Sequence, residues 1–84
     1  MAKNKGLAGR RRMTPWIGDW LRQARQGANE RLSDVAERLR SDISTISRLE
    51  TGTCTFPADD LPVILKAYGL TALEFAQRAS KEAA

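Results

Sequence analysis

Residues 35–52 have the pattern of two short amphipathic helices joined by a tight polar turn, and this pattern restricts the fold of the chain more than any other feature. Val35 and Leu39 fall on one face of the first helix. Ile46 and Leu49 fall on one face of the second. Each helix therefore has one apolar side for packing against the rest of the molecule.

The second of these helices has clear end signals and a polar outer face. Asp42 suits its N-cap, and Gly52 suits a left-handed end. Away from the apolar side, the helix carries the hydrogen-bonding side chains Ser44, Thr45, Ser47 and Arg48. A helix of this kind, braced by a partner, is what a helix-turn-helix inserts into the DNA major groove. Two surface helices of an ordinary bundle also have polar outer faces, so spacing alone leaves both interpretations open.

The same segments resemble a known family. Ala36–Leu39 and Ser44–Gly52 are similar to the lambda-repressor-like (Cro/CI, Xre-type) helix-turn-helix domains of phage, plasmid and bacterial repressors. The resemblance extends without a gap from Ile17 through Phe75. Its most specific part begins at Thr45, where the family usually shows serine or threonine, then isoleucine-serine-arginine-isoleucine-glutamate-asparagine-glycine.

A second match and one departure lie outside that string. Lys66–Thr71 resembles the family's lysine-alanine-leucine-glycine-valine-serine junction. The departure falls at Glu30, where the family normally has a buried aliphatic residue, and at Arg31, where it has a small helix-capping residue. The start of the helix that follows is where this chain differs most from the family.

The resemblance implies roles for particular residues. Base edges would be met by Ile43, Ser44, Ser47 and Arg48. An ion pair between Arg25 and Glu50 would tie the first helix to the end of the recognition helix. We assign contacts with DNA phosphates or the minor groove to Arg10, Arg11, Arg12, Arg31, Thr45, Thr51, Thr53 and Thr55. Because one such domain reads few base pairs, we expect a homodimer on a palindromic site, paired through Tyr68, Leu70, Leu73 and Gln77.

The positive charge is concentrated at the N-terminus. The whole chain has a formal net charge of +4, and all of that excess comes from five lysines and arginines within residues 1–12. This segment has two glycines and no apolar periodicity, so we expect a disordered arm. A basic arm ahead of a helix-turn-helix indicates phosphate neutralisation or an arginine in the minor groove. A solubilising tail is the alternative.

The remaining pattern predicts an all-α fold, namely a compact five-helix lambda-repressor-like domain. We expect helices over 15–26, 31–40, 43–51, 59–68 and from a Thr71–Glu74 capping box to about Arg78. Ile17, Leu21 and Ala24 form the inward face of the first helix. Strands are not expected, because alternation of period two is absent. The domain would span residues 14–80, between an arm at 1–13 and a frayed end at 81–84.

Composition excludes several function classes. The chain has 84 residues, one cysteine and no histidine, so one domain is expected without a disulfide, a zinc finger, a cofactor or an enzyme's acid–base machinery. We see no membrane span or signal peptide, and expect a cytoplasmic protein that joins the nucleoid when bound to DNA. Cys54 is expected as a free thiol and not as a redox sensor.

Together these features predict a DNA-binding transcriptional regulator, a repressor of phage, plasmid or mobile-element type. As a dimer on a palindromic duplex operator, it would block polymerase and be controlled by concentration or by a regulatory partner protein. A restriction–modification controller or an autoregulating antitoxin is a second interpretation. A protein-interaction module that keeps the fold without reading DNA is a third.

Overall fold

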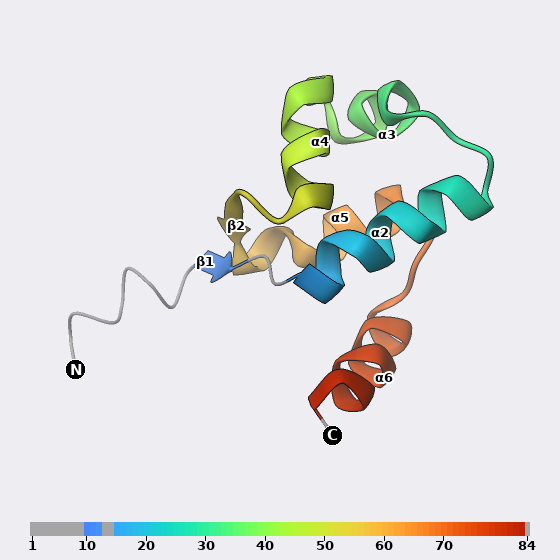
Figure 1. The fold of residues 1–84 in the computed structure, drawn as a ribbon. Coiled ribbons are helices and arrows are strands. Elements are labelled where there is room, and N and C mark those ends of the chain that lie inside the picture. Colours follow the sequence, from blue (N-terminus) through green and yellow to red (C-terminus); the bar gives the residue numbers. More distant parts are fainter. Residues whose placement is uncertain (1–9, 13–14, 84) are drawn as a thin grey trace.

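Five α-helices, one 3₁₀ turn and a short two-stranded β-ribbon form the part of the protein that the structure, a computed structural model, describes: residues 10–12 and 15–83 (Figure 1). In chain order they are β1 (Arg10–Arg12), α2 (Pro15–Gly27), α3 (Leu32–Leu39), α4 (Ile43–Thr51), β2 (Thr55–Pro57), η1 (Ala58–Asp60), α5 (Leu61–Ala67) and α6 (Ala72–Ala83). The all-α, five-helix class is confirmed.

The connection between α3 and α4 is the tight turn that the sequence predicts. Arg40 adopts the left-handed conformation, with φ of 52°, and the backbone N–H of Ser41 donates to the carbonyl of Ala36 at 2.9 Å. Asp42 caps α4, because its Oδ1 accepts the backbone N–H of Thr45 at 2.7 Å. Gly52 ends the helix with φ of 77°. The predicted caps and both predicted bounds of α4 are confirmed.

The start of α3 shows how the chain compensates for its departure from the family. The Asp34 carboxylate accepts the backbone N–H of Arg31 at 2.8 Å, which supplies part of the cap that the Arg31 side chain does not. Glu30 forms an ion pair with Arg38, whose guanidinium also donates to the carbonyl of Ala67. Through its ion pair with Arg38, Glu30 therefore links α3 to the segment that precedes this helix.

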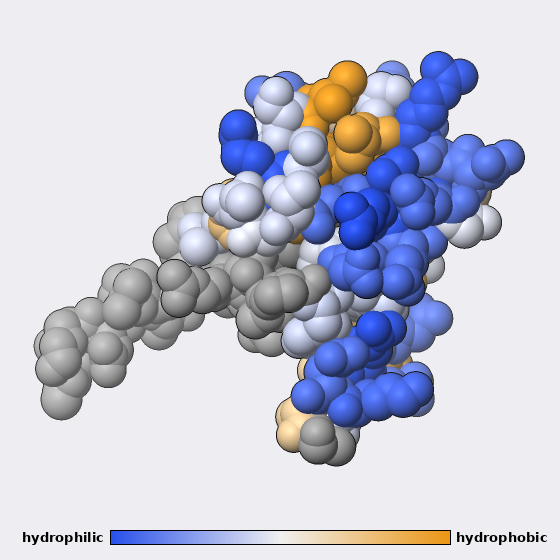
Figure 2. Space-filling view, in the orientation of Figure 1, coloured by the Kyte–Doolittle hydropathy of each residue, from blue (hydrophilic) through white to orange (hydrophobic). Residues whose placement is uncertain are grey.

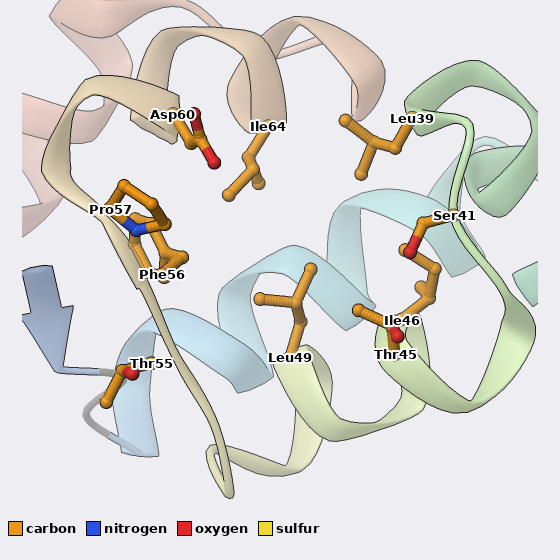
Figure 3. A pocket seen from close by; sticks show the side chains of 10 residues that line it. All are labelled: Leu39, Ser41, Thr45, Ile46, Leu49, Thr55, Phe56, Pro57, Asp60 and Ile64. Carbon is orange, nitrogen blue, oxygen red and sulfur yellow. The ribbon is translucent and has the colours of Figure 1, made fainter.

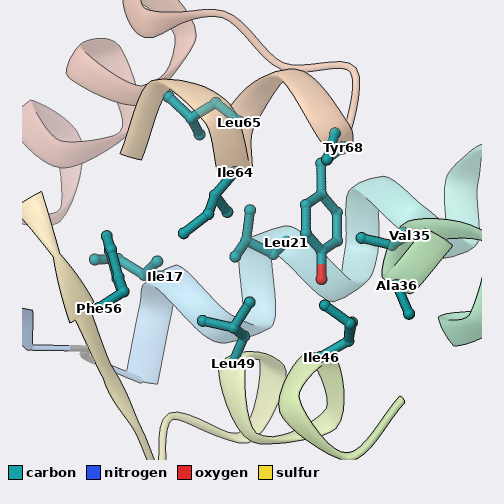
Figure 4. Packing of buried hydrophobic residues seen from close by; sticks show 11 residues of the cluster. Ile17, Leu21, Val35, Ala36, Ile46, Leu49, Phe56, Ile64, Leu65 and Tyr68 are labelled. Carbon is teal, nitrogen blue, oxygen red and sulfur yellow. The ribbon is translucent and has the colours of Figure 1, made fainter. Parts of the chain in front are cut away.

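Eleven buried side chains from four helices and β2 form one hydrophobic core (Figure 4). They are Ile17, Leu21, Val35, Ala36, Ile46, Leu49, Phe56, Ile64, Leu65, Ala67 and Tyr68. The predicted apolar faces of the first three helices meet here, with Ala24 and Leu39 half-buried at the margin. The core positions α4 by its inner side and leaves the other side available.

The fourth and fifth predicted helices differ from the structure at their ends. The expected helix over 59–68 divides into η1 and α5, with Pro62 in the first turn of α5. The capping box before α6 is confirmed, since Thr71 Oγ1 and Glu74 Oε1 each accept the other residue's backbone N–H. α6 continues to Ala83, so the predicted end at about Arg78 is wrong. The frayed end at residues 81–84 stays a prediction.

The β-ribbon corrects the prediction that strands are absent. β1 pairs antiparallel with β2, with Arg10 opposite Pro57, Arg11 opposite Phe56 and Arg12 opposite Thr55. Each strand has only three residues, which is too short for an alternating pattern to be recognised in the sequence. Residues 10–12 of the predicted disordered arm therefore have a defined place, whereas residues 1–9 and 13 of that arm lie outside the described residues.

α6 projects from the body of the fold and has no buried residue (Figure 1). Three aromatic side chains connect it to α2. The ring centroids of Trp16 and Phe75 lie 5.6 Å apart, those of Trp20 and Phe75 6.0 Å, and those of the two tryptophans 6.1 Å. Both tryptophans are half-buried in this cluster, so Trp20 covers the edge of the core through α6.

Candidate nucleic-acid interface

The two sides of α4 have different environments. Ile46 and Leu49 are buried against α2 and α3, whereas Ser44 and Arg48 are exposed. α3 and the tight turn adjoin the N-terminal end of α4, and α2 packs across α4. The helix is therefore braced from behind with a polar side free, which is the arrangement that a recognition helix requires.

The residues assigned to base edges lie away from the core. Ile43 is 50% exposed although it is a large apolar residue, Ser44 and Arg48 are exposed, and Ser47 is half-buried. Figure 2 shows an apolar patch at the end of the molecule where α3 meets α4. An exposed apolar group at the first residue of such a helix suits contact with a thymine methyl group.

The connection after α4 presents hydroxyl groups. Thr51 Oγ1 lies 3.2 Å from Thr53 Oγ1 and donates to the Arg48 carbonyl at 3.3 Å. Thr51, Thr53 and Thr55 are exposed, whereas Thr45 is half-buried. Figure 2 shows mainly pale surface over this connection, in contrast to the strongly hydrophilic surface of α6. Hydroxyl and backbone N–H groups of this kind commonly contact DNA phosphates.

The basic residues assigned to phosphate lie in two places. The ribbon sets the backbone of Arg10–Arg12 beside the segment that follows α4, with Arg12 opposite Thr55. The side chains of these three arginines lie outside the described part of the structure. Arg31 is exposed next to the first residue of α3. The structure thus brings the backbone of the basic arm to the connection after the recognition helix.

Asp42 fixes the N-terminal end of α4. Its carboxylate accepts the Thr45 backbone N–H, and the hydrogen bond with Thr45 holds the pKa of Asp42 below its usual value. Burial opposes this change, and the nearby positive charge of Arg48 assists it. The cap is therefore strongest when the Asp42 carboxylate is ionised. It holds in place the beginning of α4, where Ser44 and Ser47 lie.

Arg25 and Glu50 form an ion pair that joins α2 to the last turn of α4. Arg25 Nε donates to Glu50 Oε2 at 2.8 Å and Arg25 Nη2 to Glu50 Oε1 at 2.9 Å. A third donor, Arg25 Nη1, reaches the carbonyl of Glu30 at 3.0 Å. The hydrogen bond with Glu50 raises the pKa of Arg25, although burial acts in the opposite direction. Glu50 itself is buried, and the pair supplies its charge compensation.

Tyr68 belongs to the same network, which corrects its assignment to a dimer surface. The residue is 5% exposed and lies in the core (Figure 4). Its hydroxyl donates to Glu50 Oε2 at 2.8 Å. Burial and the hydrogen bond with Glu50 raise the pKa of Tyr68 above its usual value. The sequence pattern places Tyr68 at the end of a helix. It does not indicate that Glu50 is the partner of Tyr68, because a connection and a helix separate the two residues in the chain.

Gly18 is a structural residue that sequence reasoning missed. A Cβ atom at this position would lie 2.4 Å from the backbone oxygen of Glu50 and 2.8 Å from that of Leu49. Glycine therefore allows α2 to cross directly over the end of α4. A glycine within a helical pattern was the available signal, since such a residue often marks a close approach of two backbones.

The remaining residues of the predicted dimer surface are accessible to different degrees. Leu73 on α6 is 67% exposed, Gln77 is exposed, and Leu70 is half-buried before α6. Without Tyr68, this surface is limited to α6 and to Leu70, which lies two residues before its first residue, Ala72. Leu73 and Gln77 are therefore accessible to a partner, whereas Leu70 packs in part against the core.

A braced helix with a free polar side, a capped N-terminus and a tight turn from its partner define a DNA-binding helix-turn-helix domain. The family model described as a helix-turn-helix domain matches residues 16–77, and the chain belongs to this family. A comparison with curated proteins found no match. None of the helices in the described part of the chain is long and apolar enough to cross a membrane.

Proposed function

We propose that the protein is a sequence-specific transcriptional regulator of the lambda-repressor-like (Cro/CI, Xre-type) kind. It binds a palindromic operator as a dimer and represses by blocking polymerase. The observation that carries the proposal is the placement of α4, whose buried side is fixed by the core while Ser44, Ser47 and Arg48 remain outside. The match to the helix-turn-helix domain family supports the DNA-binding part of the proposal.

Base discrimination is assigned chiefly to Arg48. It is the one long cation among the four residues that we assign to base edges, and it is exposed on α4. Arginine can donate two hydrogen bonds to guanine O6 and N7, which discriminates against other bases by about 1–3 kcal/mol. Ile43 is assigned to a thymine methyl group, and Ser44 and Ser47 complete the contact with base edges.

Phosphate contacts surround this helix in the proposal. Thr45, Thr51, Thr53 and Thr55 supply hydroxyl groups, and Arg31 supplies a charge beside α3. Arg10–Arg12 form a basic strand next to the connection after α4. Such contacts fix the orientation of the protein on the duplex without reading its sequence.

Dimerisation is proposed through Leu70, Leu73 and Gln77. The two-fold symmetry of such a dimer requires half-sites about one helical turn apart, roughly 34 Å, with both copies of α4 on one face of the duplex. The small exposed surface favours a weak dimer that forms more readily on DNA.

Selection of bound duplexes from a random library tests the proposal. The full chain should recover a palindrome, and Arg48→Ala should lose preference at one base pair in each half-site. Arg22→Ala on α2 removes the same charge from a residue outside the proposed DNA and dimer contacts and should leave the selected sequence unchanged. Equal selectivity of the Arg48 variant would contradict the base contact. The absence of any enriched sequence, together with no salt-sensitive DNA or heparin binding, would favour a protein-interaction module.

A further inference from the structure

A groove lies behind the recognition helix, between the turn after α3 and the segment formed by β2, η1 and α5 (Figure 3). Its volume is about 250 Å³. The core residues Ile46, Leu49, Phe56 and Ile64 close its base, Leu39 and Pro57 are its half-buried apolar side chains, and Thr45 and Asp60 are polar. None of the four residues assigned to base edges lines the groove, although Thr45 and Thr55, which are assigned to phosphate contacts, lie at its margin.

The size of the groove restricts what can occupy it. A cavity of about 150 Å³ is enough for a benzene molecule, and pockets for drug-sized ligands begin at roughly 300 Å³. The present groove therefore fits one aromatic or compact aliphatic body with a short substituent. Its mainly apolar walls favour such a body over a sugar or a nucleotide.

The charge of the groove selects the polar group of the ligand. Asp60 is the one charged residue among those that line it, and its carboxylate is exposed at the margin. Asp60 has no ion-pair partner among the side chains that the structure describes. A carboxylate beside apolar walls attracts an ammonium group and repels a carboxylate. The combination favours an amine with an apolar body.

We propose that this groove binds a small organic cation, a protonated amine joined by a short chain to an aromatic or compact aliphatic body. The apolar part packs on Leu39 and Pro57, the half-buried apolar residues of the lining, and the ammonium group pairs with Asp60. Because Thr45 belongs to α4, the ligand also lies against the recognition helix. The site goes beyond the proposed function, since the free protein binds the amine whether or not it binds DNA.

Three indole compounds of similar size and different charge test the site. Tryptamine is a cation at pH 7, tryptophol is neutral, and indole-3-acetate is an anion. Each is titrated into the isotopically labelled full chain while the backbone amide shifts are recorded. We expect tryptamine to bind with a dissociation constant of about a millimolar, since ligands of this size rarely bind tightly to shallow sites. The shifts should centre on Ser41, Thr45 and Phe56, with at least fivefold weaker binding of tryptophol and none of indole-3-acetate.

Matched variants separate a specific pair from general electrostatic attraction. Asp60→Asn should reduce tryptamine binding to the level of tryptophol, whereas Asp59→Asn removes the same charge from a residue outside the groove and should change it less than twofold. Equal loss in both variants would overturn the assignment to Asp60. Equal binding of the three compounds, shifts centred on Trp16 and Trp20, or no shifts with tryptamine at 10 mM would overturn the site itself.

Discussion

Arg25 and Glu50 meet through two parallel hydrogen bonds of 2.8 and 2.9 Å, although they are 25 residues apart in the chain. The pair connects the last turn of α2 to the last turn of the recognition helix. Tyr68 approaches the same carboxylate from the end of α5. One buried charge therefore sets the mutual position of three helices, and through them the angle at which α4 is presented.

Removing the charge of Glu50 should strongly destabilise the fold. Glu50→Gln leaves the Arg25 guanidinium largely buried without a compensating charge, which costs about 3–5 kcal/mol. For a domain of this size, this loss should lower Tm by more than about 10 °C. Thermal melts followed by circular dichroism measure it.

The matched control is the ion pair of Asp19 and Arg22, whose side chains are 45% and 44% exposed. Asp19→Asn should cost less than about 1 kcal/mol, because solvent screens exposed pairs. A change of only one or two degrees in Glu50→Gln would show that the buried pair contributes no more than a surface pair.

The network around Glu50 also shows what the sequence can predict. The bounds of α4 follow from local chemistry, because Asp42 and Gly52 act within one turn of the helix. Arg25 and Glu50 were paired only through the family resemblance. The Tyr68 hydroxyl was missed because its partner is fixed by tertiary packing, which the helical pattern of the sequence does not encode.

The ribbon and α6 are two segments whose structure the sequence pattern did not predict correctly. β1 contains three consecutive arginines, a composition that indicates an exposed arm, yet its backbone pairs with the strand that carries the buried Phe56. α6 extends beyond its expected end because residues 79–83 are largely helix-favouring, and Arg78 and Glu82 form an i,i+4 ion pair. Both differences concern chain segments with few apolar residues.

Substitution of Gly18 should show whether close packing of α2 on α4 or helix propensity has the larger effect on stability. Gly18→Ala places a methyl group against backbone oxygens that cannot move without displacing α4, so we expect a loss of roughly 1–3 kcal/mol despite alanine's higher helix propensity. Gly27→Ala is the control, because a Cβ atom there meets nothing within 4 Å. It should be neutral or stabilise by up to about 1 kcal/mol. Equal urea midpoints for the two variants would contradict the close approach.

The Asp42 cap should make stability depend on pH in a defined window. Its folded-state pKa is below the ordinary value of 3.8, so the carboxylate contributes fully above about pH 3.8 and loses its contribution as pH falls through the lower folded value. Asp42→Ala should lower Tm at pH 7. The difference in Tm between the variant and the wild type should become smaller as the pH falls below about 3.8. A difference that stays constant down to pH 2.5 would contradict an ionised cap.

The basic strand should contribute to DNA binding through charge. Changing Arg10, Arg11 and Arg12 to glutamine keeps a backbone that can pair with β2 but removes three charges. The slope of log affinity against log salt should become shallower by about 0.9 for each lost phosphate contact, and by roughly 3 at most. Deletion of residues 2–9 tests the two lysines separately. If the triple variant keeps the slope of the wild type, the strand has a structural role only.

The exposed side of α6 should control dimerisation. Leu73→Glu introduces a charge at the proposed contact, and burial of that charge in a symmetric interface brings two carboxylates together. We expect binding to a full palindrome to lose cooperativity and to weaken about tenfold or more, while binding to a single half-site stays unchanged. Val63→Glu on α5 is the matched control, because Val63 is also an exposed apolar residue, at 57% against 67% for Leu73. Sedimentation of the free protein and of its operator complex measures the stoichiometry. A stable one-to-one complex of the wild type with a full palindrome would contradict the dimer, and normal pairing of the Leu73 variant would place the interface on another surface.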